Sequence, residues 1–460
     1  MSKRLILILA LAFVVGIAFA AYAEVQNVKV SGDLLIQGVA RNRFDVPIRT
    51  TPDKERAILS AVRVRIDADL TDNVATTVRL LNERVWGDEA DAVSSTGIGL
   101  DLAYVTLKEF LYSPLTMIVG RQELRYGNGL IIGDPDTNAI ASTSSALPTT
   151  LKDLSVRKAF DAVKAVLNYD PLVVDLVYAK IEENTTTTSD DVRLMGLNAA
   201  YALRKDLLTE GYLWSRDREF GSTGIGILAG NGERLNVLGT RAVYTGIQDL
   251  TLGLEGAWQF GDHLAETGLY PDERRTTANN YKSKVNAYAI QLTSNYVIPR
   301  MKKYSPAVNF SYTRLSGDKD RSISDNYTGW NPMFEDQAGG TIFNRIVGYS
   351  NAQLINLGGS MKPMDDVTVK LDWYNIRLLQ TFNTAADATR DLSGIGADTD
   401  ATIKGDKSHL ADEVDLNLIY DYTEDVQIGL NAGMYIPGAV YDKVNKKTAT
   451  QVIGSMKVTF

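Results

Sequence analysis

The sequence predicts an all-β protein, a transmembrane antiparallel β-barrel of about 18 strands with short periplasmic turns and long extracellular loops. Three observations support this prediction. The chain starts with an export signal, apolar residues alternate with polar ones along most of its length, and the connections between alternating runs are short and long in turn. The 460 residues could form two or three soluble domains, but no proline-rich linker, heptad repeat or long charged block divides them.

The export signal occupies residues 1–23. Lys3 and Arg4 precede an apolar stretch, which ends in the small-x-small cleavage site Ala-Tyr-Ala. A membrane-anchoring helix is the alternative interpretation, and the cleavage site argues against it. We therefore expect two regions, a removable signal peptide at 1–23 and an outer-membrane barrel at 24–460.

Composition excludes several classes of protein. The net charge of −8 disfavours a nucleic-acid partner, because proteins that bind nucleic acids carry basic surfaces. The chain has no cysteine, which excludes both a disulfide framework and a lipid anchor at the cleavage point. Beyond the signal, no apolar stretch is long enough for a membrane-spanning helix.

Alternation with a period of two is the strongest internal signal. Residues 414–422 (VDLNLIYDY) place valine, leucine and tyrosine on one strand face and aspartate and asparagine on the other. Residues 426–436 repeat the pattern after a short turn, and residues 57–70 place four charged side chains opposite an apolar face. Unpaired charges are heavily penalised in a dry core, so the charged face is expected to contact water. A two-layer sandwich with its charged face outward would show the same alternation, and the connections discriminate between the two.

Eighteen strands are predicted from this pattern. They cover residues 27–44, 56–70, 74–86, 99–110, 115–124, 157–169, 172–183, 191–203, 207–218, 232–245, 250–261, 284–297, 304–317, 350–362, 366–379, 410–422, 425–437 and 450–460. The connections between them are alternately tight, as at 71–73, and long, as at 125–156. Short turns on one rim and long loops on the other are the signature of outer-membrane barrels, and an even strand count places both termini in the periplasm.

The C-terminal strand QVIGSMKVTF supports the same architecture. Val452, Met456, Val458 and Phe460 share one face, and an alternating strand with a terminal aromatic residue resembles the end of bacterial outer-membrane barrels. In those proteins this end is recognised by the barrel-assembly machinery, which the resemblance makes an expected partner through Phe460. An ordinary edge strand of a soluble domain is the alternative.

Residues 119–134 (VGRQELRYGNGLIIGD) change from a strand-like sequence to a charged and glycine-rich one. A dinucleotide site would need a helix after the glycine turn, and none follows, so we interpret the glycines as the start of a long loop. Together with RKAFDAV at 157–163, this stretch resembles the bacterial alginate-export family of outer-membrane porins. Shorter matches support the resemblance: RVRIDADLTDNVATTVRLLNERVWG, LAYVTLKEF, SYTRLSGDKD, NPMF and YIPG.

The resemblance implies a channel, because the best-known member of the family is an eighteen-stranded barrel that exports an acidic polysaccharide through an arginine-rich pore. Strand parity and the family motifs predict which charged residues line the pore. Parity assigns Arg63, Arg65, Arg79, Lys164, Arg241, Lys370, Asp67, Asp69 and Asp415, together with Lys457, Glu255, Asp372 and Asp421, and motif position assigns Arg121 and Arg157. Two interpretations stay open: a basic track that attracts anions, or mutual pairing that holds the wall rigid.

Three long loops carry further expectations. Loop 125–156 is mostly small or polar, and it either folds inward and narrows the pore or forms an external flap. Loops 318–325 and 387–406 are rich in carboxylates, which are ligands that calcium favours. Neither loop has a full calcium-site spacing, so we expect solvated acidic loops without a metal.

We predict a channel in the bacterial outer membrane that passively conducts hydrophilic solutes, with anionic saccharides as candidate cargo. Lipid and lipopolysaccharide are the expected surroundings, and no cofactor is expected. The alternatives are a general small-solute diffusion porin, an outer-membrane barrel hydrolase and a plugged structural barrel. An enzyme is disfavoured, because His263 and His409 fall in predicted loops and no serine partner is identifiable by spacing.

Overall fold

The fold is taken from a computed structural model. It describes residues 27–44, 54–87, 97–136, 147, 150–183, 191–219, 232–264, 282–318, 326–337, 339–381, 406–441 and 446–460. The predicted signal peptide at 1–23 and most of the two acidic loops lie outside the described residues. No helix in the described ranges is long and apolar enough to cross a membrane.

Eighteen strands dominate the described residues. They are β1 (Asn27–Asn42), β2 (Lys54–Thr71), β3 (Val74–Val85), β4 (Gly99–Leu107), β5 (Leu115–Glu123), β6 (Ala159–Asn168), β7 (Leu172–Glu182), β8 (Val192–Arg204), β9 (Leu207–Glu219), β10 (Gly232–Ile247), β11 (Leu250–Leu264), β12 (Lys282–Val297), β13 (Ala307–Leu315), β14 (Ala352–Met364), β15 (Val367–Leu378), β16 (His409–Asp421), β17 (Val426–Pro437) and β18 (Ala449–Thr459). Three short helices accompany them: η1 (Lys152–Leu154), η4 (Pro299–Met301) and α2 (Phe343–Ile346). The strand predictions are confirmed to within a few residues at each end.

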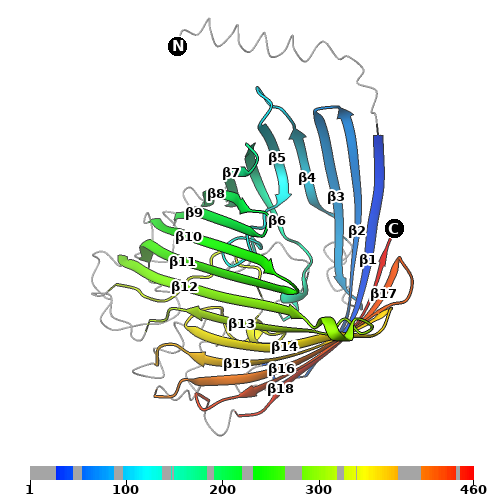
Figure 1. Cartoon of the computed structure of the whole chain (residues 1–460), viewed down its shortest axis with the longest axis vertical. Helices are drawn as coiled ribbons and strands as arrows, with labels where there is room; N and C mark the ends of the chain where they lie inside the picture. Colours follow the sequence, from blue (N-terminus) through cyan, green and yellow to red (C-terminus); the bar gives the residue numbers. More distant parts are fainter. Residues whose placement is uncertain are drawn as a thin grey trace, which may run out of the picture.

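The strands form one closed antiparallel sheet. Each strand pairs with its neighbours in sequence, and β1 pairs with both β2 and β18, so Leu34 lies opposite Val62 on one side and Val458 on the other. Figure 1 shows the tilted ring of strands, with β18 beside β1. Closure leaves no strand edge without a backbone partner, which a sheet in hydrocarbon requires. The predicted barrel class is therefore confirmed.

The two rims differ as predicted. Two-residue turns join β2 to β3, β8 to β9 and β14 to β15 on the rim where β1 begins and β18 ends. The connections on the opposite rim are longer, and the β5–β6 and β13–β14 connections are each more than thirty residues. Their length lets them reach into the barrel, which the short turns cannot do.

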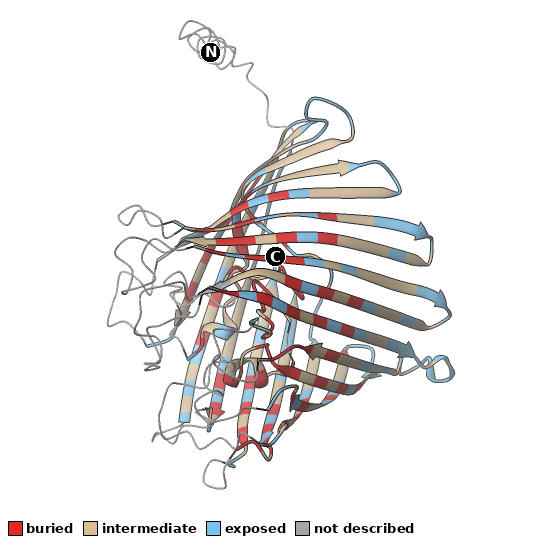
Figure 2. Cartoon of the chain, turned by 90° about the vertical axis from the view of Figure 1, so that its left-hand side faces the viewer, coloured by how far each residue is buried: buried red, intermediate tan, exposed pale blue. Residues whose placement is uncertain are grey.

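The outer face is apolar. Along β2 the even positions Ile58, Val62 and Ile66 are 37–44% exposed, whereas Leu59 and Ala61 on the other parity are buried. Figure 2 shows the same alternation of buried and exposed positions along many strands. Exposed valine and isoleucine with period two are expected where the wall contacts lipid tails.

Candidate functional site

The connection after β5 folds into the barrel. Tyr126 lies inside, with its ring 4.8 Å from that of Trp214 on β9, and its hydroxyl donates to the Asp175 carboxylate on β7 at 2.9 Å. Leu130 and Ile132 are fully buried in the same apolar cluster as the inner wall. We call residues 124–136 the first inner segment. Of the two alternatives left open by the sequence for loop 125–156, this segment follows the inward one.

Glycine is required for this inward turn. Gly127 and Gly129 have φ angles of +54° and +78°, in the left-handed region that side chains with a Cβ rarely adopt. A Cβ on Gly129 would also lie 3.1 Å from the Asp336 carbonyl oxygen. The glycines that drew attention in the sequence thus reverse the chain as it leaves the wall.

A second inner segment, residues 326–337 and 339–350, comes from the connection between β13 and β14 and pairs with the first. The Gly133 amide donates to the Phe334 carbonyl at 2.7 Å, and the Phe334 amide donates to the Ile131 carbonyl at 3.1 Å. Farther along, the Asp336 amide donates to the Gly129 carbonyl at 2.8 Å. Two connections that are about 200 residues apart in sequence therefore form one structure across the lumen. We call the two inner segments together the constriction.

Carboxylates of β16 hold the second inner segment against the wall. Glu413 accepts hydrogen bonds from the amides of Ile342 and Phe343 at 2.7 and 2.9 Å, where α2 begins. Asp415 accepts from the amide and the hydroxyl of Thr341 at 3.0 and 2.7 Å. Asp415, predicted to line the pore, thus binds backbone of the constriction as well as facing the lumen.

Ion pairs connect the inner segments to each other and to the wall. Arg125 of the first segment pairs with Asp336 of the second. Lys158, just before β6, pairs with Asp134 and lies 3.2 Å from the Asp336 carboxylate. Burial opposes the charge on Lys158, but the two carboxylates outweigh it and raise its pKa.

Glu335 is a buried acid within this cluster. Burial raises its pKa to about 8, and the backbone amide of Gln337 opposes the shift only in part. The neighbouring charges of Asp336 and Asp134 raise it further, and Lys158 lowers it. The constriction therefore contains a carboxyl group that titrates near neutral pH.

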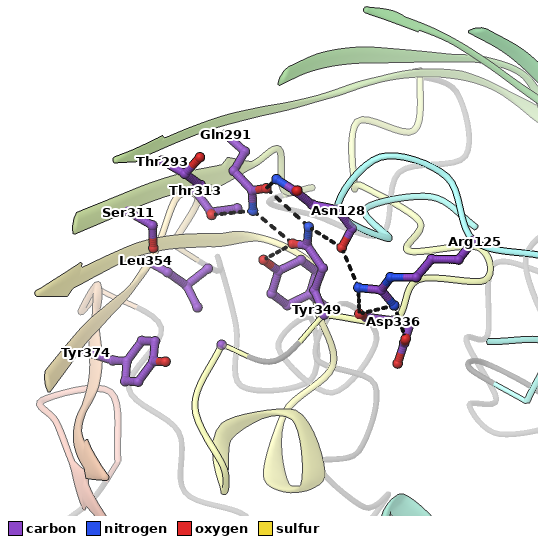
Figure 3. Close-up of a pocket in the computed structure, with 12 residues that line it drawn as sticks. Arg125, Asn128, Gln291, Thr293, Ser311, Thr313, Asp336, Tyr349, Leu354 and Tyr374 are labelled. Atoms are coloured by element: carbon purple, nitrogen blue, oxygen red, sulfur yellow. Dashed lines mark hydrogen bonds and ion pairs between the residues drawn. The ribbon is translucent and has the colours of Figure 1, made fainter. Parts of the chain in front are cut away.

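A cavity of about 320 Å³ lies between the inner segments and the wall formed by β12 to β15. It is lined by Arg125, Asn128, Gln291, Thr293, Ser311, Thr313, Asp336, Gln337, Gly339, Tyr349, Leu354 and Tyr374. Figure 3 shows the amides and hydroxyls of this lining linked by hydrogen bonds. Gln291 is central, since it contacts Thr313 at 3.1 Å and Gln337 at 2.8 Å. Such a lining can bind a hydroxylated solute.

The basic residues predicted on β2 form salt bridges. Arg63 binds Asp33 on β1 through two hydrogen bonds of 2.9 and 3.0 Å. Arg65 binds Asp67 on the same strand at 2.7 and 2.9 Å, and Asp67 also accepts from the Thr77 hydroxyl at 2.6 Å. The described contacts of this region give no partner for Asp69.

The basic residues predicted on β3 and β10 are also paired. Arg79 contacts Asp101 at 2.5 Å and bridges to Glu123, and it is 8% exposed. Arg241 bridges to Glu210 and donates to the Asn128 side chain of the first inner segment at 3.1 Å.

Four further predicted pairs or contacts complete this set. They are Arg157 with Asp136 at 3.0 Å, Lys164 with Asp175 at 3.5 Å, Lys370 with Asp372 at 3.1 Å, and Arg241 with Glu255 at 3.8 Å. With the exception of Lys457, each basic residue predicted to line the pore therefore has a carboxylate within salt-bridge distance. Their part in transport stays a prediction.

Arg121 is a correction to the predicted set. It lies opposite Ala103 on β4 and Asp161 on β6, on the face that it shares with Val119 and Val163, which are 38% and 39% exposed. The side chain therefore points to the outer surface, where it pairs with Asp161 at 2.8 Å. Arg121 was predicted to line the pore because it matches the family motif. The strand around it is apolar on both faces, so the alternation of residues did not show which way its side chain points.

Several residues of the cavity were not predicted. Gln291, Thr313, Gln337 and Tyr349 are uncharged, and a search for charged pore residues passes over them. Parity alone could have placed Gln291 and Thr313 on the inner face. Within the described ranges, no group of three histidine, cysteine, aspartate or glutamate side chains is arranged to hold a metal ion.

Comparisons with known proteins agree with this geometry. Residues 27–455 match a family described as "Alginate export". No curated protein matches the chain. Among solved structures, OccAB1 of Acinetobacter baumannii is similar with a TM-score of 0.57 at 10% identity, covering 96% of this chain and 99% of that one. OccK8 (OprE) of Pseudomonas aeruginosa is similar with a TM-score of 0.56 at 11% identity, covering 95% and 98%.

These structural likenesses show the fold, and the family match covers nearly all of the chain. The family match favours a channel over an enzyme. The protein lies in the bacterial outer membrane, and the chain belongs to the Alginate export family as an outer-membrane channel for solutes.

Proposed function

We propose that this channel passively conducts small hydrophilic, hydroxylated solutes, and that its constriction discriminates by hydrogen bonding more than by charge. One observation carries the proposal: the arginines predicted to form a track are paired with carboxylates, as in Arg63 with Asp33 and Arg79 with Asp101. A paired arginine presents little net charge to a passing anion, because the adjacent carboxylate cancels its field beyond a short range.

The cavity beside the inner segments supports the same proposal. Its wall offers amides and hydroxyls, with Tyr349 and Tyr374 presenting aromatic rings. Saccharides combine hydroxyl groups with apolar ring faces, so a lining of this chemistry suits them. A general small-solute porin, the alternative left open by the sequence, fits these observations directly.

A second candidate is the passage of an anionic saccharide. The family description favours it. So does Arg125, whose side chain lines the cavity and is half exposed although it pairs with Asp336. A carboxylate on the solute could compete with Asp336 for this guanidinium, because arginine binds carboxylates through two parallel hydrogen bonds.

Ion selectivity separates the two candidates. The reversal potential of the channel in planar bilayers under a salt gradient should show weak selectivity, and Arg63→Ala/Arg65→Ala should shift it toward cations, because the variant uncovers the Asp33 and Asp67 carboxylates. Strong anion selectivity that disappears in this double variant would contradict the proposal and restore the basic track.

Binding at the cavity is tested by current block with a neutral oligosaccharide. Gln291→Ala should weaken the block, because Gln291 links Thr313 and Gln337 in the cavity wall. Asn431→Ala is the matched control, since Asn431 is an inner-face amide that bonds Asn417 at 2.7 Å and does not line the cavity. Equal block in both variants and wild type would exclude the cavity as a binding site.

We also propose that β18 provides the signal for the barrel-assembly machinery, with Phe460 as its terminal aromatic residue. Phe460 is 66% exposed, and its amide and carbonyl pair with Gly32 of β1 at 3.0 and 2.8 Å. Phe460→Ala should reduce the amount of assembled barrel in the outer membrane, measured by heat-modifiable mobility in gels. Unchanged assembly would remove this role.

A further inference from the structure

The outer face carries a band of charged side chains where the strands reach the long-loop rim. On β9 to β12, cations of this band pair with carboxylates on adjacent strands. Arg234 binds Asp217 through hydrogen bonds of 2.6 and 2.9 Å, and Lys284 binds Asp262 at 2.6 Å. Within each pair the cation and the carboxylate neutralise each other, so neither needs an external counter-ion.

The band has a different chemistry on β13, β14 and β15. Arg314, Gln353 and Arg377 are direct cross-strand neighbours at the same level of the wall. Arg314 donates to the Tyr288 hydroxyl at 3.1 Å, and Arg377 donates to the Asn375 side-chain oxygen at 3.0 Å. In the part of the chain that the structure describes, the contacts of both arginines are with neutral groups.

Arg314, Gln353 and Arg377 lie where the lipid-facing surface ends toward the long-loop rim. On the same outer face and nearer the short-turn rim are Leu357, Leu371 and Trp373, which are 41–54% exposed. An apolar face of this kind contacts acyl chains, and a polar group directly above it lies at the level of the headgroups.

Two cations at this spacing attract a shared anion. The Cα atoms of Arg314 and Arg377 are separated by two strand spacings, or about 10 Å, and Gln353 lies between them. The Tyr312 hydroxyl donates to the Gln353 carbonyl oxygen at 3.3 Å, which leaves the amide N–H₂ group of Gln353 to donate outward. Two guanidinium groups and an amide thus lie on adjacent strands at one level of the outer face.

We propose that Arg314, Gln353 and Arg377 bind the phosphorylated headgroup of a lipid in the outer leaflet. Guanidinium groups bind phosphate oxygens through paired hydrogen bonds, and both arginines remain charged at any physiological pH. The apolar face below them takes the acyl chains of the same lipid, which a free anion could not use. The site lies outside the pore, so it does not depend on what the channel conducts.

Lipid binding by the folded, detergent-solubilised barrel tests the proposal. Phosphatidic acid is added as a lipid with an accessible phosphomonoester, and bound lipid is counted by native mass spectrometry. Arg314→Gln/Arg377→Gln should bind it at least about tenfold more weakly, since each lost charged hydrogen bond contributes a factor of this order. Arg234→Gln is the matched control, because Arg234 is exposed on the same outer face but already pairs with Asp217.

The outcomes are distinct. Retained binding in the control and loss in the double variant, with both variants folded by heat-modifiable mobility, support the site. Equal binding by wild type and double variant overturns it. Two further probes identify the source of the phosphate: phosphatidylcholine should bind weakly, and competition by millimolar inorganic phosphate as effective as phosphatidic acid would show a free-anion site and overturn the lipid assignment.

Discussion

Two neighbouring salt bridges of the lumen wall use the same chemistry in different surroundings, although Arg65 and Arg79 are direct cross-strand partners on β2 and β3. The Arg65 and Asp67 side chains pair while remaining 37% and 34% exposed. The Arg79 and Asp101 side chains, one strand farther along the sheet, pair while 10% and 0% exposed. The residue types and contact lengths are alike, and only the access of water differs.

The difference shows that charge along a pore wall has no fixed energetic role. Water screens the exposed pair, so either partner can be lost at small cost to stability. In the buried pair, the loss of one partner leaves the other buried without compensation, which is strongly unfavourable. The exposed pair can therefore tune ion flow, whereas the buried pair holds the wall in place.

The largest expected effect comes from breaking the buried pair. Arg79→Ala should lower the free energy of unfolding by about 3–5 kcal/mol, because Asp101 stays buried without its partner. Arg65→Ala should lower it by about 0–1 kcal/mol. Urea unfolding in lipid vesicles, followed by tryptophan fluorescence, measures both. Equal losses would refute the distinction between the exposed and the buried pair.

The pair between the inner segments should give the next largest effect. Arg125→Ala, Asp336→Ala and the double variant should each raise single-channel conductance, because the two segments lose a contact across the lumen. In a double-mutant cycle of unfolding free energies, the coupling should be about 0.5–3 kcal/mol. Strict additivity would show that the two side chains do not stabilise each other. The Lys370–Asp372 wall pair serves as the control for conductance, since it joins no inner segment.

A smaller effect is expected from the backbone of the first inner segment. Gly129→Ala should cost about 1–2 kcal/mol, since its φ of +78° is in the left-handed region. Gly454→Ala on β18 is the control, because a Cβ there would meet no atom within 4 Å. Thermal unfolding in detergent measures the difference. A stable Gly129→Ala protein with wild-type conductance would show that the inward turn does not require glycine.

The most gradual effect is that of pH on stability, acting through Glu335 of the second inner segment. The pKa of Glu335 is about 8 in the folded chain and about 4.5 in the unfolded one, so the folded state binds the proton more tightly. Stability should therefore fall as pH rises from about 4.5 to 8 and change no further above it. Glu335→Gln should reduce this slope in unfolding measured between pH 5 and 9. An unchanged slope would assign the pH dependence to another group.

The fold was more predictable from the sequence than the constriction. Period-two alternation locates a strand because lipid and water act on its two faces at every step, as at Ile58, Val62 and Ile66. The same parity carries little information where both faces are apolar, and for that reason Arg121 was placed inside although it points outward. The pairing of the inner segments depends on contacts between residues about 200 positions apart, such as Gly133 with Phe334, and no local pattern encodes it.

The seam between β1 and β18 has a consequence for biogenesis. Gln37 and Ser455 are register partners, although more than 400 residues separate them along the chain. Bringing such distant segments together carries a loop-closure cost in entropy, and non-local topologies of this kind form slowly. The cylinder cannot be sealed until its last strand has been synthesised and delivered. Until then, every newly made chain has two strand edges with unpaired backbone groups as it crosses the cell envelope. Chaperones must keep these edges from pairing with those of other copies.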